Sequence, residues 1–445
     1  MAHSGASNTS AGDPDLAAAP TGRATDELLR FLSQLGHALI ASGEAVAVIE
    51  DLLRRIGRAH GIERVSVVAL PTVLFVKLDD GTSPRLDFTS EEGLTLRFDQ
   101  IERVFALARD AEARAVAPAE GIVRLRAILA QRAHFGAMAS VLGHMLMTIG
   151  IALCLKPTLE IVGSAAFFGL VVGVLKIVSR NRGMLETLLP TVAAFVVAAV
   201  ALTMVKYGIA ASPLRVLIAS LVTFLPGGIL AVATMDLAYA DMVSGASRFV
   251  AGLVQLLFLV LGMTIAASLV GLPPERLLVE PVVEHLVPWA VWLGVACFGV
   301  GNLLHYSAEP RALPWMLVVL AIAMAAQLAG NAAFGGYMSG FVGALFITPV
   351  AYLIQYRLGG PAAMVTFLPA LWLLVPGSLG LIGLTELASD DHLAGVENFT
   401  TTLFSIVAIA LGSLVGSGVY NALFDPIFRR AGSMAESVRQ RWRRW

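Results

Sequence analysis

The order of apolar and polar positions divides the chain into four stretches. Residues 1–25 are mostly small and polar, a composition that predicts a disordered tail. Residues 26–131 mix apolar with charged positions, as in a small soluble domain. Long apolar runs then fill residues 132–423, and the final stretch, 424–445, is basic. The pattern therefore predicts a soluble domain followed by a membrane-embedded region.

The soluble stretch has the periodicities of a small α/β domain. Apolar positions recur at helical spacing on both sides of Ser42-Gly43-Glu44, which predicts two helices. β-Branched runs and a turn signal at Asp79-Asp80-Gly81 predict three strands, at Val65–Leu70, Thr72–Lys77 and Arg85–Phe88. Two further helices are expected, at about Asp99–Ala113 and Pro118–Gln131.

This domain holds side chains from which a hydrolytic site could be built, namely Ser42, His37, His60 and Asp79. Their spacing fits no nucleophile motif, and no glycine-rich turn presents a serine. We therefore interpret them as cap and surface residues, and we expect no enzymatic activity.

The membrane region contains ten apolar segments, each long enough to cross about 30 Å of hydrocarbon at about 1.5 Å per residue. The predicted spans are residues 137–155, 160–179, 185–207, 213–239, 243–271, 283–304, 312–330, 334–357, 361–386 and 394–423. Pro273-Pro274 separates two halves, 132–272 and 273–423, with five spans each. Because five is odd, a second copy of one sequence unit must insert in the opposite orientation. The segments therefore predict a polytopic α-helical protein with a 5+5 inverted repeat.

A sequence repeat supports this division. Leu225–Gly262 aligns without a gap on Val375–Gly412, with ten identities and one Asp/Glu exchange. Both copies contain helix breakers, Pro226-Gly227-Gly228 and Pro376-Gly377. Interrupted backbone at membrane depth is tolerated where it lines a cavity or is buried in protein. We interpret the breaks as a substrate site near the midplane, where half-helix N-termini attract an anionic group. Ordinary proline kinks are the alternative.

Four acids recur in the repeat: Asp236, Asp241, Glu386 and Asp391. A carboxylate at the bilayer centre costs about 2.5–3.5 kcal/mol, so such residues face a cavity or the bundle interior. One interpretation is proton coupling, and the alternative is that each acid marks a helix end at the water interface. Further polar residues could line a cavity or bond a neighbouring helix: Thr234, Asn302, Gln327 and Asn331.

Composition and charge agree with a membrane protein. The chain is 57% hydrophobic, its mean hydropathy is +0.77 and 14% of its residues are charged, against about 25% in soluble proteins. The net charge of −1 argues against nucleic acid as a partner. Lys and Arg concentrate in the loops on the side of the soluble domain, which predicts an inner (plasma) membrane protein with both termini in the cytoplasm. No metal-ligand cluster, nucleotide loop or haem motif occurs, so we expect no cofactor.

Three stretches carry a resemblance to a known family: LGHALIASGEAVAVIEDLLRRIGRAHGI near the N-terminus, LPGGILAVATMDLAYADMVSGASRF at the first break and FLPALWLLVPGSLGLIGL at the second. Over about residues 26–423 the chain resembles the threonine/serine exporter family in its fused, single-chain form. The resemblance implies a soluble N-terminal domain, ten spans and export of small amino acids by the proton gradient. The positions that match its motifs are Pro226, Gly227, Asp236, Asp241, Gly245, Pro376 and Gly377.

The chain departs from that pattern just before the first aspartate. Many members carry Asn and Arg there, whereas this chain has Ala233, Thr234 and Met235. The family also includes a sister branch that exports dicarboxylates.

We therefore expect a secondary exporter of small polar amino acids, driven by proton antiport, with the lipid bilayer, an amino acid and protons as partners. A dicarboxylate exporter of the same fold, and a membrane sensor that signals through its N-terminal domain, are the alternatives.

Overall fold

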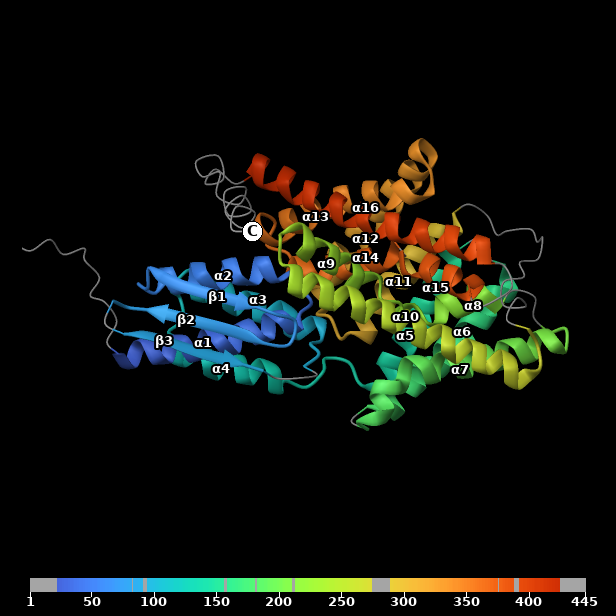
Figure 1. Cartoon of the computed structure of the whole chain (residues 1–445), viewed down its shortest axis with the longest axis horizontal. Coiled ribbons are helices and arrows are strands. Elements are labelled where there is room, and N and C mark those ends of the chain that lie inside the picture. Colours follow the sequence, from blue (N-terminus) through green and yellow to red (C-terminus); the bar gives the residue numbers. More distant parts are fainter. Residues whose placement is uncertain are drawn as a thin grey trace, which may run out of the picture.

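The computed structural model describes residues 22–81, 83–90, 94–155, 158–180, 182–209, 213–273, 289–374, 376–387 and 392–424. The predicted N-terminal tail up to residue 21, nearly all of the basic C-terminal tail and Asp391 lie outside these ranges. An α/β domain and a longer bundle of helices lie end to end (Figure 1).

Seven elements form the α/β domain: α1 (Gly22–Ala41), α2 (Val46–Ala59), β1 (Arg64–Ala69), β2 (Leu74–Asp79), β3 (Pro84–Thr89), α3 (Phe98–Glu112) and α4 (Pro118–Ala130). The strands form an antiparallel sheet in the order β1-β2-β3. Alternate residues of β2, among them Leu74, Val76 and Leu78, are buried on the face that α1 covers, because successive side chains of a strand point to opposite faces.

The predicted second strand, Thr72–Lys77, is wrong by two residues. β2 begins at Leu74, because the residues before it form the hairpin connection. The N–H group of Leu70 donates to the Val73 carbonyl at 2.8 Å and closes that connection. Pro71, which has no N–H group to give to a sheet, lies within it.

The bundle contains α5 (Ala137–Cys154), α6 (Leu159–Ser179), α7 (Met184–Lys206), α8 (Pro213–Ser220), η1 (Val222–Phe224), α9 (Gly227–Ala238), α10 (Met242–Val270), α11 (Ala290–His305), η3 (Pro310–Ala312), α12 (Leu313–Phe334), α13 (Gly336–Tyr356), α14 (Ala363–Leu373), α15 (Pro376–Leu387) and α16 (His392–Phe424). Each predicted break separates two of these helices, since α9 begins at Gly227 and α15 begins at Pro376.

Seven of the described helices are long and apolar enough to cross a membrane, and the bent pair of α8 with η1 and α9 makes an eighth candidate. Large apolar side chains remain exposed along them, such as Val250 and Leu257 of α10, as expected of a surface that contacts lipid. The chain is therefore a multi-pass membrane protein. The other two predicted spans, 283–304 and 361–386, fall on the shorter α11 and on α14 with α15, so the ten-span layout remains a prediction.

Glycine contacts recur in the bundle at an interval of 150 residues. In each case the position of a Cβ atom on the glycine is already occupied by a neighbouring helix, so only glycine allows the approach. The equivalent contacts are Gly245 on Leu237 and Gly395 on Leu387, then Gly262 on Thr191 and Ala194, and Gly412 on Phe341 and Ala344. α7 thus packs on α10 as α13 packs on α16.

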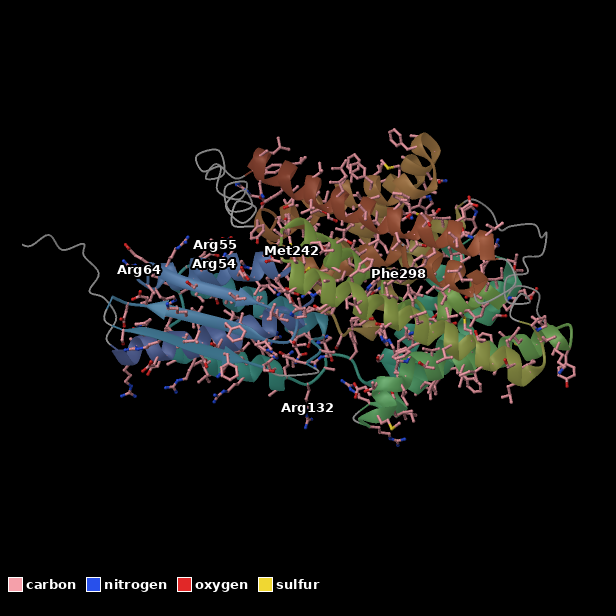
Figure 2. The ribbon with its side chains drawn as sticks, viewed as in Figure 1. Arg54, Arg55, Arg64, Arg132, Met242 and Phe298 are labelled. Carbon is pink, nitrogen blue, oxygen red and sulfur yellow. The ribbon has the colours of Figure 1, made fainter. Side chains whose placement is uncertain are left out.

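The contact between α5 and α11 is symmetric in itself. Gly143 lies against Gly301, and Gly150 lies against Gly294, so the two helices cross in antiparallel directions at glycines on both sides. Phe298, between those contacts, lies inside the bundle (Figure 2). Met242, the first residue of α10, lies at the end of the bundle that faces the α/β domain (Figure 2), and α16 finishes near that same end (Figure 1).

Candidate functional site

The first break opens into a cavity between the bundle and the α/β domain. The chain bends by 58° between α8 and the segment that continues into α9. Gly228, in the first turn of α9, lies so close to the indole of Trp372 that an added Cβ would be 3.2 Å from Nε1. A cavity of about 450 Å³ is lined here by Gly228, Arg248 and Trp372 of the bundle and by His37 and Gly43 of the α/β domain. We call it the domain-side cavity.

Arg248, in the wall of this cavity, belongs to a buried ion pair. Nη1 of Arg248 is 2.7 Å from Oδ2 of Asp236, and both side chains are almost fully buried. Oδ1 of Asp236 accepts the N–H group of Val46, the first residue of α2, at 3.1 Å. A carboxylate at a helix N-terminus is stabilised by the unpaired N–H groups and by the helix dipole. Asp236 therefore binds a cation of the bundle and the start of a helix in the α/β domain.

Arg248 also contacts the α/β domain. Its Nη2 donates to the carbonyl oxygen of Glu44 at 3.3 Å, so the guanidinium bridges the α1–α2 connection and Asp236. Burying an ion pair requires further hydrogen bonds to offset the loss of water, and these contacts supply them. Ser244, one turn earlier on α10, donates to the Ala69 carbonyl at 3.2 Å and extends the junction.

Sequence reasoning did not pair Arg248 with Asp236. The signal that could have found it is the spacing, because positions 12 apart flank the turn between α9 and α10. The same spacing recurs in the second half, where the Asn398 amide donates to Oε2 of Glu386 at 2.6 Å. Asn398 aligns with Arg248 in the repeat. The two halves thus hold equivalent acids, one bonded to a cation and one to an amide.

The second break borders another cavity, which we call the distal cavity. Its volume is about 300 Å³, and it is lined by Leu373 and Leu374 just before the break and by Gln327 and Asn331 of α12. The Gln327 amide donates to the Leu374 carbonyl at 3.3 Å. Trp372 lines the domain-side cavity, whereas the next two residues line the distal one. The end of α14 therefore lies between the two cavities.

A family model described as "Putative threonine/serine exporter" matches residues 30–270, which is more than half of the 445 residues. The chain belongs to the ThrE family. The match covers the α/β domain and the bundle through the end of α10, including the first break and the Asp236–Arg248 pair. No curated protein and no solved structure matches the chain.

Other predicted site residues of this ThrE member have different surroundings. Thr234 donates to the Leu230 carbonyl of its own helix at 2.9 Å, and Asp241 precedes the first turn of α10. Asn302 is fully buried and donates to the Phe298 carbonyl at 2.8 Å. Asp391 lies outside the described residues.

Glu44 is an acid of the α/β domain that interacts with both members of the Asp236–Arg248 pair. Burial raises the pKa of its carboxyl from 4.5 to about 7, the Ala45 N–H group and Arg248 act against this, and Asp236 adds to it. The carboxyl group accepts the Ala45 N–H at 3.1 Å. The junction with the membrane bundle therefore contains a group that titrates near neutral pH.

The side chains of the hydrolase alternative have separate partners in this ThrE member. Ser42 donates to the Leu39 carbonyl at 2.6 Å, and the His60 ring is 3.1 Å from the Ala111 carbonyl. Asp79 contacts Arg64 at 3.5 Å, whereas His37 lines the domain-side cavity. None of these contacts joins a serine to a histidine.

Proposed function

We propose that the chain is a secondary exporter of small polar amino acids, of the threonine/serine kind, driven by proton antiport across an inner or plasma membrane. The observation that carries this proposal is the Asp236–Arg248 pair beside the domain-side cavity. Membership of the ThrE family supports the substrate class. A volume of about 450 Å³ falls within the roughly 300–1,000 Å³ of small-molecule sites.

An ion pair has the charges that a zwitterion requires. The carboxylate of an amino acid can bind Arg248, which offers a planar set of N–H donors, and its ammonium group can bind Asp236. The Asp236–Arg248 ion pair is then replaced by two ion pairs with the substrate, and the net charge of the site stays at zero. A dicarboxylate would leave negative charge uncompensated in a buried place, which costs several kcal/mol. The pair therefore favours amino acids over the dicarboxylate alternative.

The same pair provides a route to antiport. Asp236 can hold the ammonium group of the substrate only while its carboxyl group is ionised. A proton on Asp236 would therefore compete with the substrate, which is the condition for exchange of one against the other. Glu386, at the equivalent position of the second half, is proposed as the acid that serves the other side of the membrane.

Two cavities at opposite ends of one barrier fit alternating access. The end of α14, where the second break begins, separates the domain-side cavity from the distal cavity. The equivalent glycine contacts and the antiparallel crossing of α5 and α11 support an inverted repeat. We infer that the two breaks open these cavities in turn while the α/β domain remains in the cytoplasm.

Transport by the full chain in liposomes tests the function. With an imposed pH gradient, labelled threonine or serine should move against the proton flow, while a labelled dicarboxylate should not compete. If the protein transports the dicarboxylate and no amino acid, the proposed substrate class is wrong and the dicarboxylate alternative takes its place. The absence of any transport by well-inserted protein would favour the alternative of a membrane sensor.

Reporter fusions test the membrane topology. A reporter at Asp390 should lie on the opposite side of the membrane from one at Arg182, and finding both on the same side would exclude the inverted repeat.

A further inference from the structure

Three basic side chains meet inside the bundle, apart from the Asp236–Arg248 pair. They are His144 of α5, Lys176 of α6 and His305 of α11. Nζ of Lys176 is 3.1 Å from Nε2 of His305, and the two imidazole rings have centroids 5.2 Å apart. His144 is fully buried. Lys176 is in the last turn of α6 and His305 ends α11, whereas His144 is two turns into α5.

The hydrogen bonds fix which ring nitrogens carry protons. Nδ1 of His305 is 2.8 Å from the Ser140 carbonyl, and Nδ1 of His144 is 3.0 Å from the Gly169 carbonyl. A carbonyl oxygen only accepts, so both Nδ1 atoms are donors. The Nε2 atoms then have free lone pairs, which point at Lys176 and at the hydroxyl group of Thr223, 3.2 Å away. Each ring therefore offers one nitrogen to a further proton.

The surroundings allow this cluster about one positive charge. Among the described residues, the hydrogen-bond partners of the three side chains outside the cluster are Ser140, the Gly169 carbonyl and Thr223, and none is a carboxylate. Like charges a few ångströms apart without a counter-ion oppose each other's ionisation. The short N···N contact between Lys176 and His305 needs one proton between the two atoms. The cluster can thus alternate between neutral and singly charged.

The cluster contacts the first break from two sides. Thr223 and Phe224 belong to η1, which ends two residues before Pro226, and Nζ of Lys176 lies 5.0 Å from the centroid of the Phe224 ring. Such a contact attracts an ammonium group but not a neutral amine. On the other side, the His305 ring packs on Tyr306 at 4.8 Å between centroids, and Tyr306 packs on Trp372 at 5.0 Å. Trp372 lines the domain-side cavity beside Gly228.

We propose that His144, Lys176 and His305 form a proton-binding site that controls the first break. This inference rests on the proposed proton antiport. When the proton is bound, Lys176 is an ammonium group that bonds Nε2 of His305 and holds η1 through the Phe224 ring. When the proton leaves, the neutral amine no longer attracts that ring and η1 is released. One proton is taken up and one released per cycle, with no other bond made or broken.

The two substitutions of Lys176 separate a proton site from a structural cation. Lys176→Arg keeps a permanent charge, because a guanidinium does not lose its proton in proteins, whereas Lys176→Met removes the charge. Full-length protein in liposomes, with labelled threonine as the probe, is assayed for equal-pH exchange over about pH 5.5–8.5 and for gradient-driven export. The exposed His134→Gln is the matched control.

We expect exchange by both Lys176 variants to become independent of pH. Their gradient-driven export should fall roughly tenfold or more, because one coupled proton changes a transport equilibrium tenfold for each pH unit of the gradient. His134→Gln should behave as the wild type. Normal coupling in Lys176→Arg would overturn the proposal, since a fixed cation would then suffice. If Lys176→Met inserts poorly, His305→Gln serves instead, and unchanged coupling in that variant has the same meaning. A wild-type protein that moves no amino acid overturns the proposed function itself, and this inference with it.

Discussion

The carboxylate of Asp236, near the end of α9, accepts both the guanidinium of Arg248 at 2.7 Å and the first N–H group of α2 at 3.1 Å. One side chain of the membrane bundle thereby fixes a cation beside the cavity and the entry of a helix in the α/β domain. The α/β domain is for this reason part of the wall of the proposed substrate site, and changes at the pair should affect binding and docking together.

Replacing Arg248 should abolish transport. Arg248→Met leaves the buried Asp236 carboxylate without its cation, which costs about 3–5 kcal/mol, and it removes the group proposed to bind the substrate carboxylate. Labelled-threonine exchange should fall about a hundredfold or more, equivalent to about 2.7 kcal/mol. Arg311→Met is the matched control, because Arg311 joins the bundle to Glu102 of the same domain through an exposed side chain and should matter little. Equal losses in both variants would mean that docking, rather than binding, was measured.

Neutralising the repeated acids should uncouple transport. Asp236→Asn and Glu386→Gln should each lower gradient-driven export about tenfold or more, because a group that cannot lose a proton cannot exchange it. Exchange at equal pH should fall less for Glu386→Gln, since its partner Asn398 can still bond an amide. Glu397→Gln, an exposed neighbour on α16, should be neutral. Full gradient-driven export in both variants would remove these acids from the proton pathway.

Repairing the first break should stop transport without preventing insertion. Pro226→Ala with Gly227→Ala restores helix propensity by about 4 kcal/mol in total, which allows η1 and α9 to merge and Gly228 to leave Trp372. Export in liposomes should fall sharply while the amount of inserted protein stays unchanged. Pro190→Ala, which removes a proline from within α7, should retain export. Unimpaired flux in the repaired protein would make the break a packing feature only.

The equivalent glycines should have equivalent effects on stability. Gly262→Ala and Gly412→Ala each force a methyl group against a backbone carbonyl of the neighbouring helix, and overpacking of this kind costs about 1–3 kcal/mol. Thermal unfolding midpoints in detergent should drop in both variants. Gly163→Ala and Gly418→Ala, whose added methyl groups meet no atom within 4 Å, are the controls. A large drop in only one of the pair would contradict the structural equivalence of the halves.

Glu44 should make the stability of the domain junction depend on pH. Its pKa is raised by burial from 4.5 to about 7, so between these values the folded state binds a proton that the unfolded state does not. Stability then falls as pH rises from 4.5 to 7, by on the order of 3 kcal/mol if the whole shift is expressed. Glu44→Gln, which keeps an acceptor for the Ala45 N–H, should raise the unfolding midpoint at pH 8 and leave it unchanged near pH 4. An equal change at both pH values would exclude titration of Glu44 as the cause.

Local signals in the sequence determined much of the architecture. Apolar run length marks the membrane helices, and the Pro-Gly breaks mark where α9 and α15 begin, because proline and glycine act on the backbone where they stand. The 150-residue repeat also follows from sequence, and the contacts of Gly262 and Gly412 extend it to α7 and α13. The strand at Leu74 was misplaced because a β-branched run does not show where a hairpin turns.

Only the tertiary structure decided which polar groups contact one another. The Val46 N–H group and the Asp236 carboxylate are 190 positions apart in the sequence, and Lys176 and His305 are 129 positions apart. Such contacts depend on how helices cross and how deeply each side chain is buried, and neither helical periodicity nor local propensity contains that information. Asp236 was recognisable as an acid in an apolar segment, but its binding to Arg248 and to the start of α2 follows from the docking of the α/β domain on the bundle. That docking also buries Glu44 and completes the domain-side cavity.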